Sequence, residues 1–489
     1  MERVAIIGMG VSGSAVLLAY VKAMKSHPDY QVQIDCYDSP LSFGKGKAFR
    51  EQAEQAIINS RTHQISYDVD RILDFKEWLS SNQPSLSQES YVSRGLFGQY
   101  LHERSQALVE ASGAQLHWSK VQSLTWLPKL DKWLVTTSLD DQGFEQVFDR
   151  VHLCCGELPS QDPYGLQGHP HYIGEVYPLE AIPQHLNQAQ RLAILGSGLS
   201  AIDVAKYLYE HFTQPSLTFV SRQGYFPSVR GKDYQLDFHY LTDAKVARLL
   251  AVNGGRFSFD QFQALFEAEL ARFDLEYDAF MAHYFLPGRA GMEMTLHNPQ
   301  QVGLMQAILL QVSVVMSQIW PAMSQTCRRQ FNQRYQKALV CFRNPMPATS
   351  AQELLLGMDQ GRIQLVAGLK QIDVLDQGFK LQTQDYEYEA DWLFNATGMD
   401  FKLQNLGEKE ALFADLLDKQ YGQVDTAGGL SLNYQTLNLI SPRFGEWSTL
   451  HGHGLLVNGA IFMNNSTNKI QEQAQRLIDR LVKEWQAKE

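Results

Sequence analysis

The chain contains one short pattern twice, in which an apolar strand is followed by a glycine turn and a helix. The first copy spans residues 4–13 and reads VAIIGMGVSG, and the second spans residues 192–201 and reads LAILGSGLSA. Each is followed by a helical run and by another strand, at residues 32–38 and 217–221. This order is typical of the opening of a Rossmann-like dinucleotide-binding module. The sequence therefore predicts an α/β protein with two such modules.

The residue types in these turns suit a dinucleotide. The first glycine permits a tight turn, the second lets the backbone approach a pyrophosphate, and the third allows the helix to pack against the strand. The phosphates then lie at the helix N-terminus, where unpaired N–H groups and the helix dipole favour negative charge. The candidate cofactor contacts are Gly8, Gly10, Ser12 and Gly13 in the first turn, and Gly196, Gly198 and Ser200 in the second.

The strands that follow the two helices end in different chemical groups. The first ends in Asp38 and Ser39, and a carboxylate at this position accepts hydrogen bonds from a ribose diol. The second ends in Ser221 and Arg222, and a guanidinium can bind a 2′-phosphate that a carboxylate would repel. The first module is therefore predicted to bind FAD, and the second to bind NADPH rather than NADH. The alternative for Arg222 is a solvated arginine after a strand.

Two later segments share a second pattern. Residues 149–156 and residues 391–398 each combine a charged residue, an apolar strand and a glycine. Such a strand returns the chain to the centre of a parallel sheet and ends close to the cofactor, so we expect each module to have its own closing strand. The candidate contacts in these segments are Gly156 for FAD, and Asn395 and Gly398 for NADPH.

Residues 232–344 differ in composition from both modules. Their apolar residues follow helical spacing without a comparable strand pattern, which predicts a helical insertion in the second module. The most apolar stretch, residues 302–320, is interrupted by Gln and Ser, which favours a buried helix over a membrane span. A last helix with one apolar face is predicted over about residues 469–485.

Composition argues against several classes of protein. The 489 residues include 42 Lys and Arg against 53 Asp and Glu, a net charge of −11 without a basic run, which argues against nucleic acid as a partner. The five cysteines form no C-x-x-C pair, which argues against a zinc ribbon or a redox dithiol. Cys154 and Cys155 are adjacent in an apolar run, which predicts a buried strand of a reduced, cytoplasmic protein. Two His-x-His pairs, at residues 169–171 and 451–453, have no further ligands at a recognisable spacing, so no metal is predicted.

Taken together, these motifs resemble the bacterial FAD–NAD(P)-binding flavoproteins that are related to N-hydroxylating and flavin-containing monooxygenases. The likeness covers most of the chain outside the insertion, and further segments that carry it lie at residues 43–49, 57–60, 91–101, 154–156, 220–224 and 395–398. The resemblance implies a division into an FAD domain (1–165 and 400–489), an NAD(P)H domain (166–231 and 345–399) and the insertion (232–344) as a substrate or lid region.

The resemblance also implies further cofactor contacts. It places Arg94 and Gln99 near the flavin, Val121 near the adenine and Gly459 near the isoalloxazine end; the alternative for Arg94 is a helix-capping or surface arginine. One departure concerns a fingerprint of the flavin-containing monooxygenases, because Pro178 stands where that fingerprint has a histidine. The more similar members include proteins like L-aspartate N-hydroxylases and urate hydroxylases, and the sequence does not choose between these substrates.

The implied activity is hydroxylation of a small polar substrate, such as an amino acid or a similar nitrogen compound, by O₂ through a flavin hydroperoxide. Because the cofactors carry out the chemistry, the protein has to supply a dry pocket, and no catalytic residue is predicted. Candidate polar contacts near the flavin end are Asn464, Asn465 and Ser466. Candidates for the substrate pocket are His451, His453, Arg230 and Arg289.

Two alternatives stay open beside a monooxygenase. An NAD(P)H:acceptor flavin reductase would use both cofactors without inserting oxygen, although the missing C-x-x-C pair argues against a disulfide reductase. A binding or sensor protein that only holds FAD would need no second site, and Gly196 and Arg222 argue against it. The sequence carries no signal for an oligomeric state.

Overall fold

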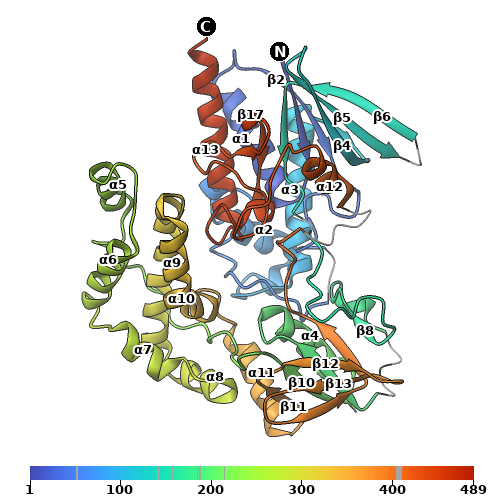
Figure 1. The fold of residues 1–489 in the computed structure, drawn as a ribbon, viewed down its shortest axis with the longest axis vertical. Helices are drawn as coiled ribbons and strands as arrows, with labels where there is room; N and C mark the ends of the chain where they lie inside the picture. The colour runs from blue at the N-terminus through green and yellow to red at the C-terminus, as the bar shows by residue number, and fades with distance from the viewer. Residues whose placement is uncertain are drawn as a thin grey trace. The chain divides into compact units, whose positions relative to one another are not determined.

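The two glycine turns belong to different units of the computed structural model (Figure 1). Unit 1 consists of Met1–Glu54, Ser60–Pro159 and Met399–Glu489, and unit 2 consists of Gln55–Asn59 and Ser160–Gly398. The two main boundaries between the units therefore fall at 159/160 and 398/399, where the sequence predicts 165/166 and 399/400, and the short segment Gln55–Asn59 is a part of unit 2 that the sequence does not predict. The structure describes residues 1–50, 53–139, 142–156, 158–183, 186, 189–213, 215–403 and 410–488.

Unit 1 begins with the first glycine motif and ends with a long helix. Its strands are β1 Glu2–Ile7, β2 Val32–Tyr37, β3 Gln115–His117, β4 Lys120–Leu127, β5 Lys132–Leu139, β6 Gln142–Phe148, β7 Arg150–Leu153, β16 Asn438–Ser441 and β17 Gly445–Gly452. Its α-helices are α1 Val11–Ser26, α2 Asp74–Asn82, α3 Arg94–Ser112, α12 Ala411–Asp418 and α13 Thr467–Gln486. Short 3₁₀ helices lie at Val69–Arg71, Pro84–Leu86 and Gly454–Val457.

The main sheet of unit 1 has the strand order β16-β17-β7-β1-β2-β3. Its neighbours are parallel except β16, which runs antiparallel to β17. The predicted closing strand is β7, and it pairs with β1 from Val4↔Arg150 to Ile7↔Leu153. Since β2 lies on one side of β1 and β7 on the other, the order of the strands switches at β1. In open α/β sheets, ligands bind at this switch point, beyond the carboxyl ends of the strands.

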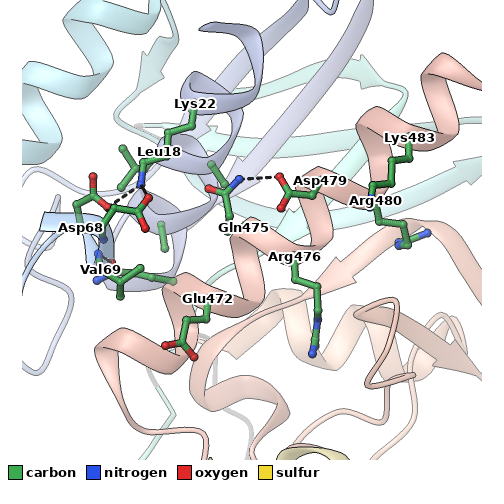
Figure 2. Close-up of a pocket in the computed structure, with 14 residues that line it drawn as sticks. Leu18, Lys22, Asp68, Val69, Glu472, Gln475, Arg476, Asp479, Arg480 and Lys483 are labelled. Atoms are coloured by element: carbon green, nitrogen blue, oxygen red, sulfur yellow. Dashed lines mark hydrogen bonds and ion pairs between the residues drawn. The ribbon is translucent and has the colours of Figure 1, made fainter. Parts of the chain in front are cut away.

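Helix α13 packs against α1, on the same unit. Its apolar residues recur with helical spacing, which confirms the predicted last helix, and its buried side chains are Ile470, Gln471, Gln473, Ala474, Leu477, Ile478, Leu481 and Val482. A groove of about 520 Å³ follows the two helices, as Figure 2 shows. In this groove the Lys22 ammonium lies 2.6 Å from a carboxylate oxygen of Asp68 and 2.6 Å from one of Asp70. These ion pairs neutralise the cation that α1 contributes to the groove.

A three-stranded antiparallel sheet, β4-β5-β6, is joined to the C-terminal segment by aromatic packing. Trp133 on β5 is fully buried, and its ring centroid lies 4.8 Å from that of Trp447 on β17 and 4.9 Å from that of Trp126 on β4. The indole N–H of Trp133 donates to Thr449 Oγ1 at 3.0 Å. The cluster therefore connects residues that are more than 300 positions apart in sequence.

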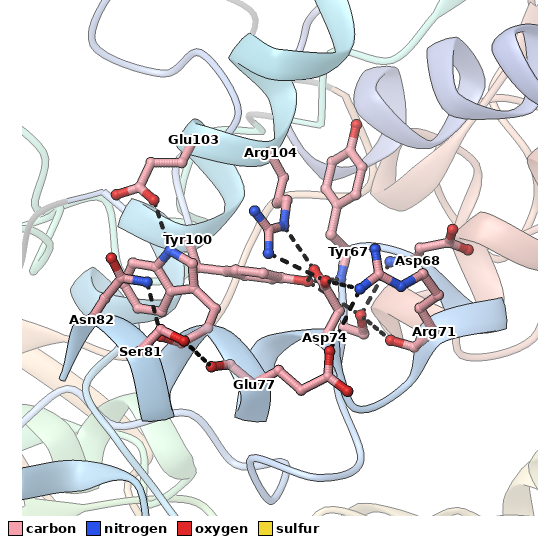
Figure 3. A network of polar contacts seen from close by, with 12 residues as sticks. Tyr67, Asp68, Arg71, Asp74, Glu77, Ser81, Asn82, Tyr100, Glu103 and Arg104 are labelled. Atoms are coloured by element: carbon pink, nitrogen blue, oxygen red, sulfur yellow. Dashed lines mark hydrogen bonds and ion pairs between the residues drawn. The ribbon is translucent and has the colours of Figure 1, made fainter. Parts of the chain in front are cut away.

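A buried carboxylate fixes α2 against α3, as Figure 3 shows. The Asp74 carboxylate accepts hydrogen bonds from the hydroxyl of Tyr100 at 2.7 Å and from Arg104 Nε at 2.8 Å, and Arg71 lies 2.9 Å away. Burial alone would raise the pKa of Asp74, but the Arg104 and Tyr100 hydrogen bonds and the two guanidinium charges lower it below its ordinary value. The hydroxyl of Tyr100 also accepts the backbone N–H of Tyr67, so the network ties the loop before α2 to the same point.

Unit 2 contains the second glycine motif and the predicted insertion. Its strands are β8 Tyr172–Ile173, β9 Arg191–Leu195, β10 Ser216–Val220, β11 Ile363–Val366, β12 Gln371–Val374, β13 Phe379–Gln382, β14 Glu387–Ala390 and β15 Trp392–Asn395. Its α-helices are α4 Leu199–His211, α5 Asp243–Val252, α6 Phe259–Ala271, α7 Tyr277–Tyr284, α8 Gly288–His297, α9 Pro299–Ala322, α10 Gln325–Ala338 and α11 Ala348–Asp359. A π-helical segment, Leu339–Arg343, continues α10, and a 3₁₀ helix lies at Leu179–Ala181.

The main sheet of unit 2 repeats the plan of unit 1. Its order is β11-β10-β9-β15-β8, with parallel neighbours, so the closing strand β15 lies beside the motif strand β9 as β7 lies beside β1. An antiparallel sheet, β12-β13-β14, precedes the closing strand here, as β4-β5-β6 does in unit 1. The prediction of an α/β fold with two Rossmann-like modules is therefore confirmed.

The predicted insertion is helical in the part of the chain that the structure describes, from α5 to the π-helical segment after α10. Among the described helices, α9 alone is long and apolar enough to cross a membrane, judged by its length and composition only. Its most apolar window is 61% buried inside the protein, against α5, α8 and the π-helical segment. Its apolar surface is thus largely used in packing the insertion.

Candidate dinucleotide sites

The first cavity lies over the first glycine turn and has a volume of about 250 Å³. Its described lining comes from the turn, from the loop after β2, from the end of β7 and from the C-terminal segment. These lining residues are Gly8, Gly10, Val11, Ser12, Asp38, Ser42, Lys45, Gly46, Lys47, Ala48, Phe49, Cys154, Cys155, Gly156, Met399, Leu455, Asn465, Thr467 and Ile470. Five of the predicted FAD contacts, Gly8, Gly10, Ser12, Asp38 and Gly156, are thus brought together.

Two glycines of this turn have no room for a side chain. A Cβ on Gly8, whose φ is +91°, would lie 2.9 Å from the backbone between Cys154 and Cys155. A Cβ on Gly13 would lie 1.9 Å from the carbonyl oxygen of Gly8, so the third glycine lets α1 approach the turn. Helix α1 begins after Gly10 without a side-chain cap from any described residue. Its first N–H groups are therefore available to a phosphate.

Asp38 fastens the end of β2 to the glycine turn. Its carboxylate accepts hydrogen bonds from the backbone N–H of Met9 at 2.7 Å, from the backbone N–H of Ser39 at 2.7 Å and from the hydroxyl of Ser42 at 2.6 Å. Burial raises the pKa of Asp38 although these hydrogen bonds act in the opposite direction. An ionised carboxylate has about four acceptor positions, so one is left for a ribose hydroxyl.

The second cavity lies over the second glycine turn and has a volume of about 640 Å³. Part of its lining comes from this turn, the end of β10 and the loop that follows, and part comes from the insertion. Its described lining residues are Tyr164, Leu195, Gly196, Ser197, Gly198, Val220, Ser221, Arg222, Gln223, Tyr225, Phe226, Pro227, Phe285, Asn332, Gln333, Gln336, Lys337, Val340, Cys341, Leu369, Ala396 and Thr397. Gly196, Gly198, Ser221 and Arg222 are the predicted NADPH contacts among them.

Two glycines of the second turn have different surroundings. Gly196 has a φ of +105°, and a Cβ on it would lie 2.7 Å from the carbonyl oxygen of Ala396 in the closing segment. A Cβ on Gly198 would meet nothing within 4 Å. Gly198 precedes α4, which no described side chain caps, so this open space adjoins free helix N–H groups. The place suits a pyrophosphate.

The charge of the second cavity is positive. Arg222 and Lys337 are its only charged side chains among the described lining residues, and no Asp or Glu lines it there. Arg222 is exposed and makes no side-chain hydrogen bond or ion pair with any residue that the structure describes. The Ser221 hydroxyl accepts the backbone N–H of Gly224 at 2.9 Å and keeps its own proton for donation. The cavity therefore favours an anion such as a phosphorylated dinucleotide.

Residues 5–158 match the model of the family described as FAD-NAD(P)-binding. The match covers the glycine turn, Asp38 and the closing strand β7 of unit 1, and it ends before Ser160, where the main segment of unit 2 begins. A comparison of the sequence with curated proteins finds no match.

Solved structures share the fold of this chain. The ornithine N-hydroxylase KtzI of Kutzneria sp. 744, with reduced FAD, NADP⁺ and L-ornithine, is similar at 12% identity and a TM-score of 0.58. The ornithine hydroxylase PvdA of Pseudomonas aeruginosa is similar at 11% identity and a TM-score of 0.60. The L-lysine 6-monooxygenase of Pseudomonas syringae is similar at 14% identity and a TM-score of 0.60. Each likeness covers 99% of this chain and 99% of the other.

Other predicted FAD contacts lie outside the described lining of the first cavity. Gly13 lies within α1, Ser39 donates its N–H to Asp38, and Arg94 is the first residue of α3. Gln99 is exposed, and its amide donates to Glu103 Oε1 at 3.2 Å. Val121 is buried in β4, and a Cβ on Gly459 would lie 2.0 Å from the carbonyl oxygen of Gly428.

Three predicted NADPH contacts also lie outside the described lining of the second cavity. Ser200 is in the first turn of α4. Asn395 is buried, its Nδ2 donates to the carbonyl oxygens of Gln161 and Gly174, and its Oδ1 accepts from the N–H and the hydroxyl of Thr397. This amide therefore joins β15 to the segments before and after β8. Gly398, with a φ of +101°, accepts the N–H of Gln161 at 3.0 Å.

Sequence reasoning missed the loop that covers the first cavity and the helix that lines the second. The loop after β2 contributes Ser42, Lys45 and Lys47, and its Gly46 Cα lies 3.0 Å from where a Cβ of Gly10 would be. The available signal was the segment at residues 43–49, which carried the family resemblance without an assigned role. No motif marked the polar residues of α10.

His451 and His453 do not line either cavity, contrary to what the sequence suggests. Both are buried in unit 1, where His451 lies in register with His152 on β7. Arg150 Nη1 donates to His451 Nε2 at 2.8 Å, and Nε2 of His453 lies 3.0 Å from Nδ1 of His152. Burial lowers the pKa of His453 to about 3 and the pKa of His152 and of His451 well below the ordinary value.

Two other candidates for a substrate pocket have structural contacts. Arg289 is paired with Glu293 at 2.7 Å and with Asp359 at 2.5 Å on the surface, so its guanidinium is already used. Arg230 donates to the carbonyl oxygen of Asn59 at 2.7 Å. In the described part of the chain, no group of three or more His, Cys, Asp or Glu side chains is arranged to hold a metal ion.

Proposed function

We propose that this protein is an FAD- and NADPH-dependent monooxygenase that hydroxylates a small polar substrate, an amino acid or a similar nitrogen compound. The observation that carries the proposal is the presence of two glycine-turn cavities, each at the switch point of its own parallel sheet, in one chain. The N-hydroxylating monooxygenases with the same fold over 99% of both chains support this choice over a flavin reductase.

The residues of the first cavity fit FAD. The open N–H groups at the start of α1 would hold the pyrophosphate, and the remaining acceptor position of Asp38 would hold a ribose hydroxyl. Apolar side chains of Phe49, Leu455 and Ile470 would help to exclude water. FAD, when bound, would accept the hydride of NADPH and activate O₂.

The residues of the second cavity fit NADPH. The start of α4 at Gly198 would receive the pyrophosphate, and Arg222 with the Ser221 hydroxyl would bind the 2′-phosphate. NADH lacks that phosphate, so the preference between the two nucleotides depends on Arg222. Unit 2 outside residues 232–344 is accordingly proposed as the NADPH domain, and unit 1 as the FAD domain.

The insertion and the cysteines support two further parts of the proposal. Because residues 232–344 line part of the second cavity, we propose them as the region that shapes access for the substrate. All five cysteines are free, which supports a reducing compartment such as the cytoplasm.

The test is an anaerobic titration of the FAD-loaded protein with NADPH and then with NADH. We expect NADPH to bleach the flavin absorbance and NADH to do so at least about tenfold less efficiently, because one charge-assisted phosphate contact contributes roughly 1.5–3 kcal/mol. The matched variant is Arg222→Gln, for which the difference between the two nucleotides should largely disappear. Equal responses of the unmodified protein to NADPH and NADH would contradict the assignment of Arg222.

A second measurement separates oxygen insertion from electron transfer. In air, NADPH consumption is followed with a panel of amino acids, diamines and purines, while hydrogen peroxide and products that have gained one oxygen atom are quantified. A monooxygenase should convert one compound with less peroxide released per NADPH. Peroxide formation that no compound suppresses, together with rapid reduction of quinone or dye acceptors, would favour the flavin reductase.

A further inference from the structure

The helical insertion presents an unused polar surface to the second cavity. Along α10 the side chains of Asn332, Gln333, Gln336 and Lys337 line this cavity, at positions that repeat with helical spacing. None of the four makes a side-chain hydrogen bond or ion pair with any residue that the structure describes. Three amides and one ammonium therefore face the space in which the dinucleotide is proposed to bind.

The opposite face of α10 is firmly packed. Phe331 and Tyr335 are buried, and their rings lie 4.9 Å from Phe262 and 5.3 Å from Phe266, respectively, on α6. The hydroxyl of Tyr277 also donates to the backbone carbonyl of Arg334 at 2.9 Å. The orientation of α10 is therefore set by its aromatic face, which leaves the polar face directed at the cavity.

The end of α10 is also tied to the loop that carries Arg222. In the π-helical segment that continues α10, the carbonyl oxygen of Cys341 accepts the backbone N–H of Ser228 at 2.8 Å, and its thiol lies 3.4 Å from the carbonyl oxygen of Phe226. Lys337 is one helical turn before Cys341. The two cations in the described lining of the cavity, Arg222 and Lys337, thus come from two segments that are connected by these contacts.

We propose that Lys337 is a second phosphate-binding residue of the dinucleotide site, contributed by the insertion. This inference rests on the proposed function, since it assumes that the second cavity holds NADPH. The ammonium of Lys337 brings three hydrogen-bond donors and a full positive charge to a cavity whose described lining has no carboxylate. The phosphate group that it contacts is either the 2′-phosphate or the pyrophosphate, which are separable by experiment.

The test measures the Kd of NADP⁺ and of NAD⁺ for the FAD-loaded protein by calorimetry, so no turnover is needed. Lys337→Gln should raise the Kd for NADP⁺ about tenfold, as loss of one charge-assisted hydrogen bond implies, and Lys337→Arg should largely preserve it. The matched control is Arg329→Gln, which removes one exposed charge from the same helix at a position outside the lining of the cavity. It should leave the Kd unchanged.

The NAD⁺ measurements identify the phosphate. A rise in Kd for NADP⁺ alone assigns Lys337 to the 2′-phosphate, and an equal rise for NAD⁺ assigns it to the pyrophosphate. A Kd for Lys337→Gln equal to that of Arg329→Gln would overturn the inference. The proposed function would still stand after such a result if the unmodified protein binds NADP⁺ and Arg222→Gln weakens this binding. If the unmodified protein does not bind NADP⁺ at all, both the proposed function and the inference on Lys337 are wrong.

Discussion

Among single residues, the buried histidines of unit 1 give the clearest pH dependence. Arg150 cannot accept a hydrogen bond, so His451 must accept through Nε2 and is neutral in the folded state. Tyr20 joins the same group, with its hydroxyl 2.9 Å from Nε2 of His152. Protonation of these rings would place charge in a buried site beside the Arg150 cation, which explains why their pKa values are lowered.

This arrangement predicts a loss of stability on mild acidification. An unfolded histidine takes up a proton below pH about 6.5 while the buried one stays neutral, so the free energy of unfolding falls by about 1.4 kcal/mol per pH unit for each histidine below that pH. Urea unfolding at pH 7.5, 6.5 and 5.5 measures this slope. His453→Gln should reduce the slope by about one histidine's share.

The acidic residues act in a separate pH range. Asp74 has a lowered pKa, so its contribution to stability is present above the ordinary pKa of about 4 and is lost below it. A slope between pH 6.5 and 5.5 that His453→Gln leaves unchanged would therefore count against the histidine explanation.

Residue types at the motifs were predictable because each has one physical reason to be there. A tight turn close to a pyrophosphate requires glycines such as Gly8 and Gly10, and a ribose diol is bound by a carboxylate such as that of Asp38. The structure brings these three residues to one cavity. His451 and His453 were expected at a substrate pocket because a short polar pattern does not reveal that both side chains are buried beside Arg150 and His152 of β7. Lys337 escaped prediction because its role depends on how a helix without a motif packs, and only tertiary contacts determine that.

At the scale of elements, the tryptophan cluster holds the sheet β4-β5-β6 to β17. We predict that Trp133→Ala lowers the free energy of unfolding by about 3–5 kcal/mol, because it removes a fully buried indole and leaves a cavity. Thermal or urea unfolding measures the loss. Phe144→Ala is the matched control, since Phe144 is an aromatic residue of β6 that is 50% exposed, and its effect should stay within about 0.5 kcal/mol.

The elements themselves were largely readable from sequence. Apolar runs before a glycine turn predicted β1 and β9, and the charged residue that opens each closing strand predicted β7 and β15. The pairing of the strands in the second antiparallel sheet was harder to foresee, because β12, β13 and β14 are short strands with few buried residues. Their pairing depends on register, which composition does not specify.

At the scale of the whole molecule, we predict that a substitution in one proposed cofactor site leaves binding at the other site unchanged. Gly198→Ala is predicted to fold normally, because nothing lies within 4 Å of the new Cβ, yet the methyl group would occupy the place proposed for the pyrophosphate. Its FAD content should be unchanged and its Kd for NADP⁺ raised about tenfold or more. Gly10→Ala would press on Gly46 of the covering loop and should lower FAD content while NADP⁺ binding persists.

Flavin absorbance and calorimetry check both halves of this prediction. If Gly198→Ala lost FAD, or if Gly10→Ala lost NADP⁺ binding to the same degree as FAD, the two cavities would not be separate cofactor sites. A combined loss with a lowered melting temperature would point to misfolding, and the unfolding curve of each variant is therefore measured beside its Kd.

Unit 1 is built from segments that are far apart in the sequence, which affects the order in which the protein can fold during its synthesis. Strand β17 lies beside β7, and helix α13 covers α1. Met399, Leu455 and Ile470 line the first cavity. These residues, β17 and α13 all belong to the last segment of unit 1, which follows Gly398 in the chain. On a translating ribosome, β1, β2 and β7 emerge first. They lack β17 and α13 while unit 2 is synthesised and can fold. The apolar side of α1 is then uncovered and could bind a chaperone. The first cavity, where FAD is proposed to bind, is complete only after Met399 and the segment that follows it have emerged.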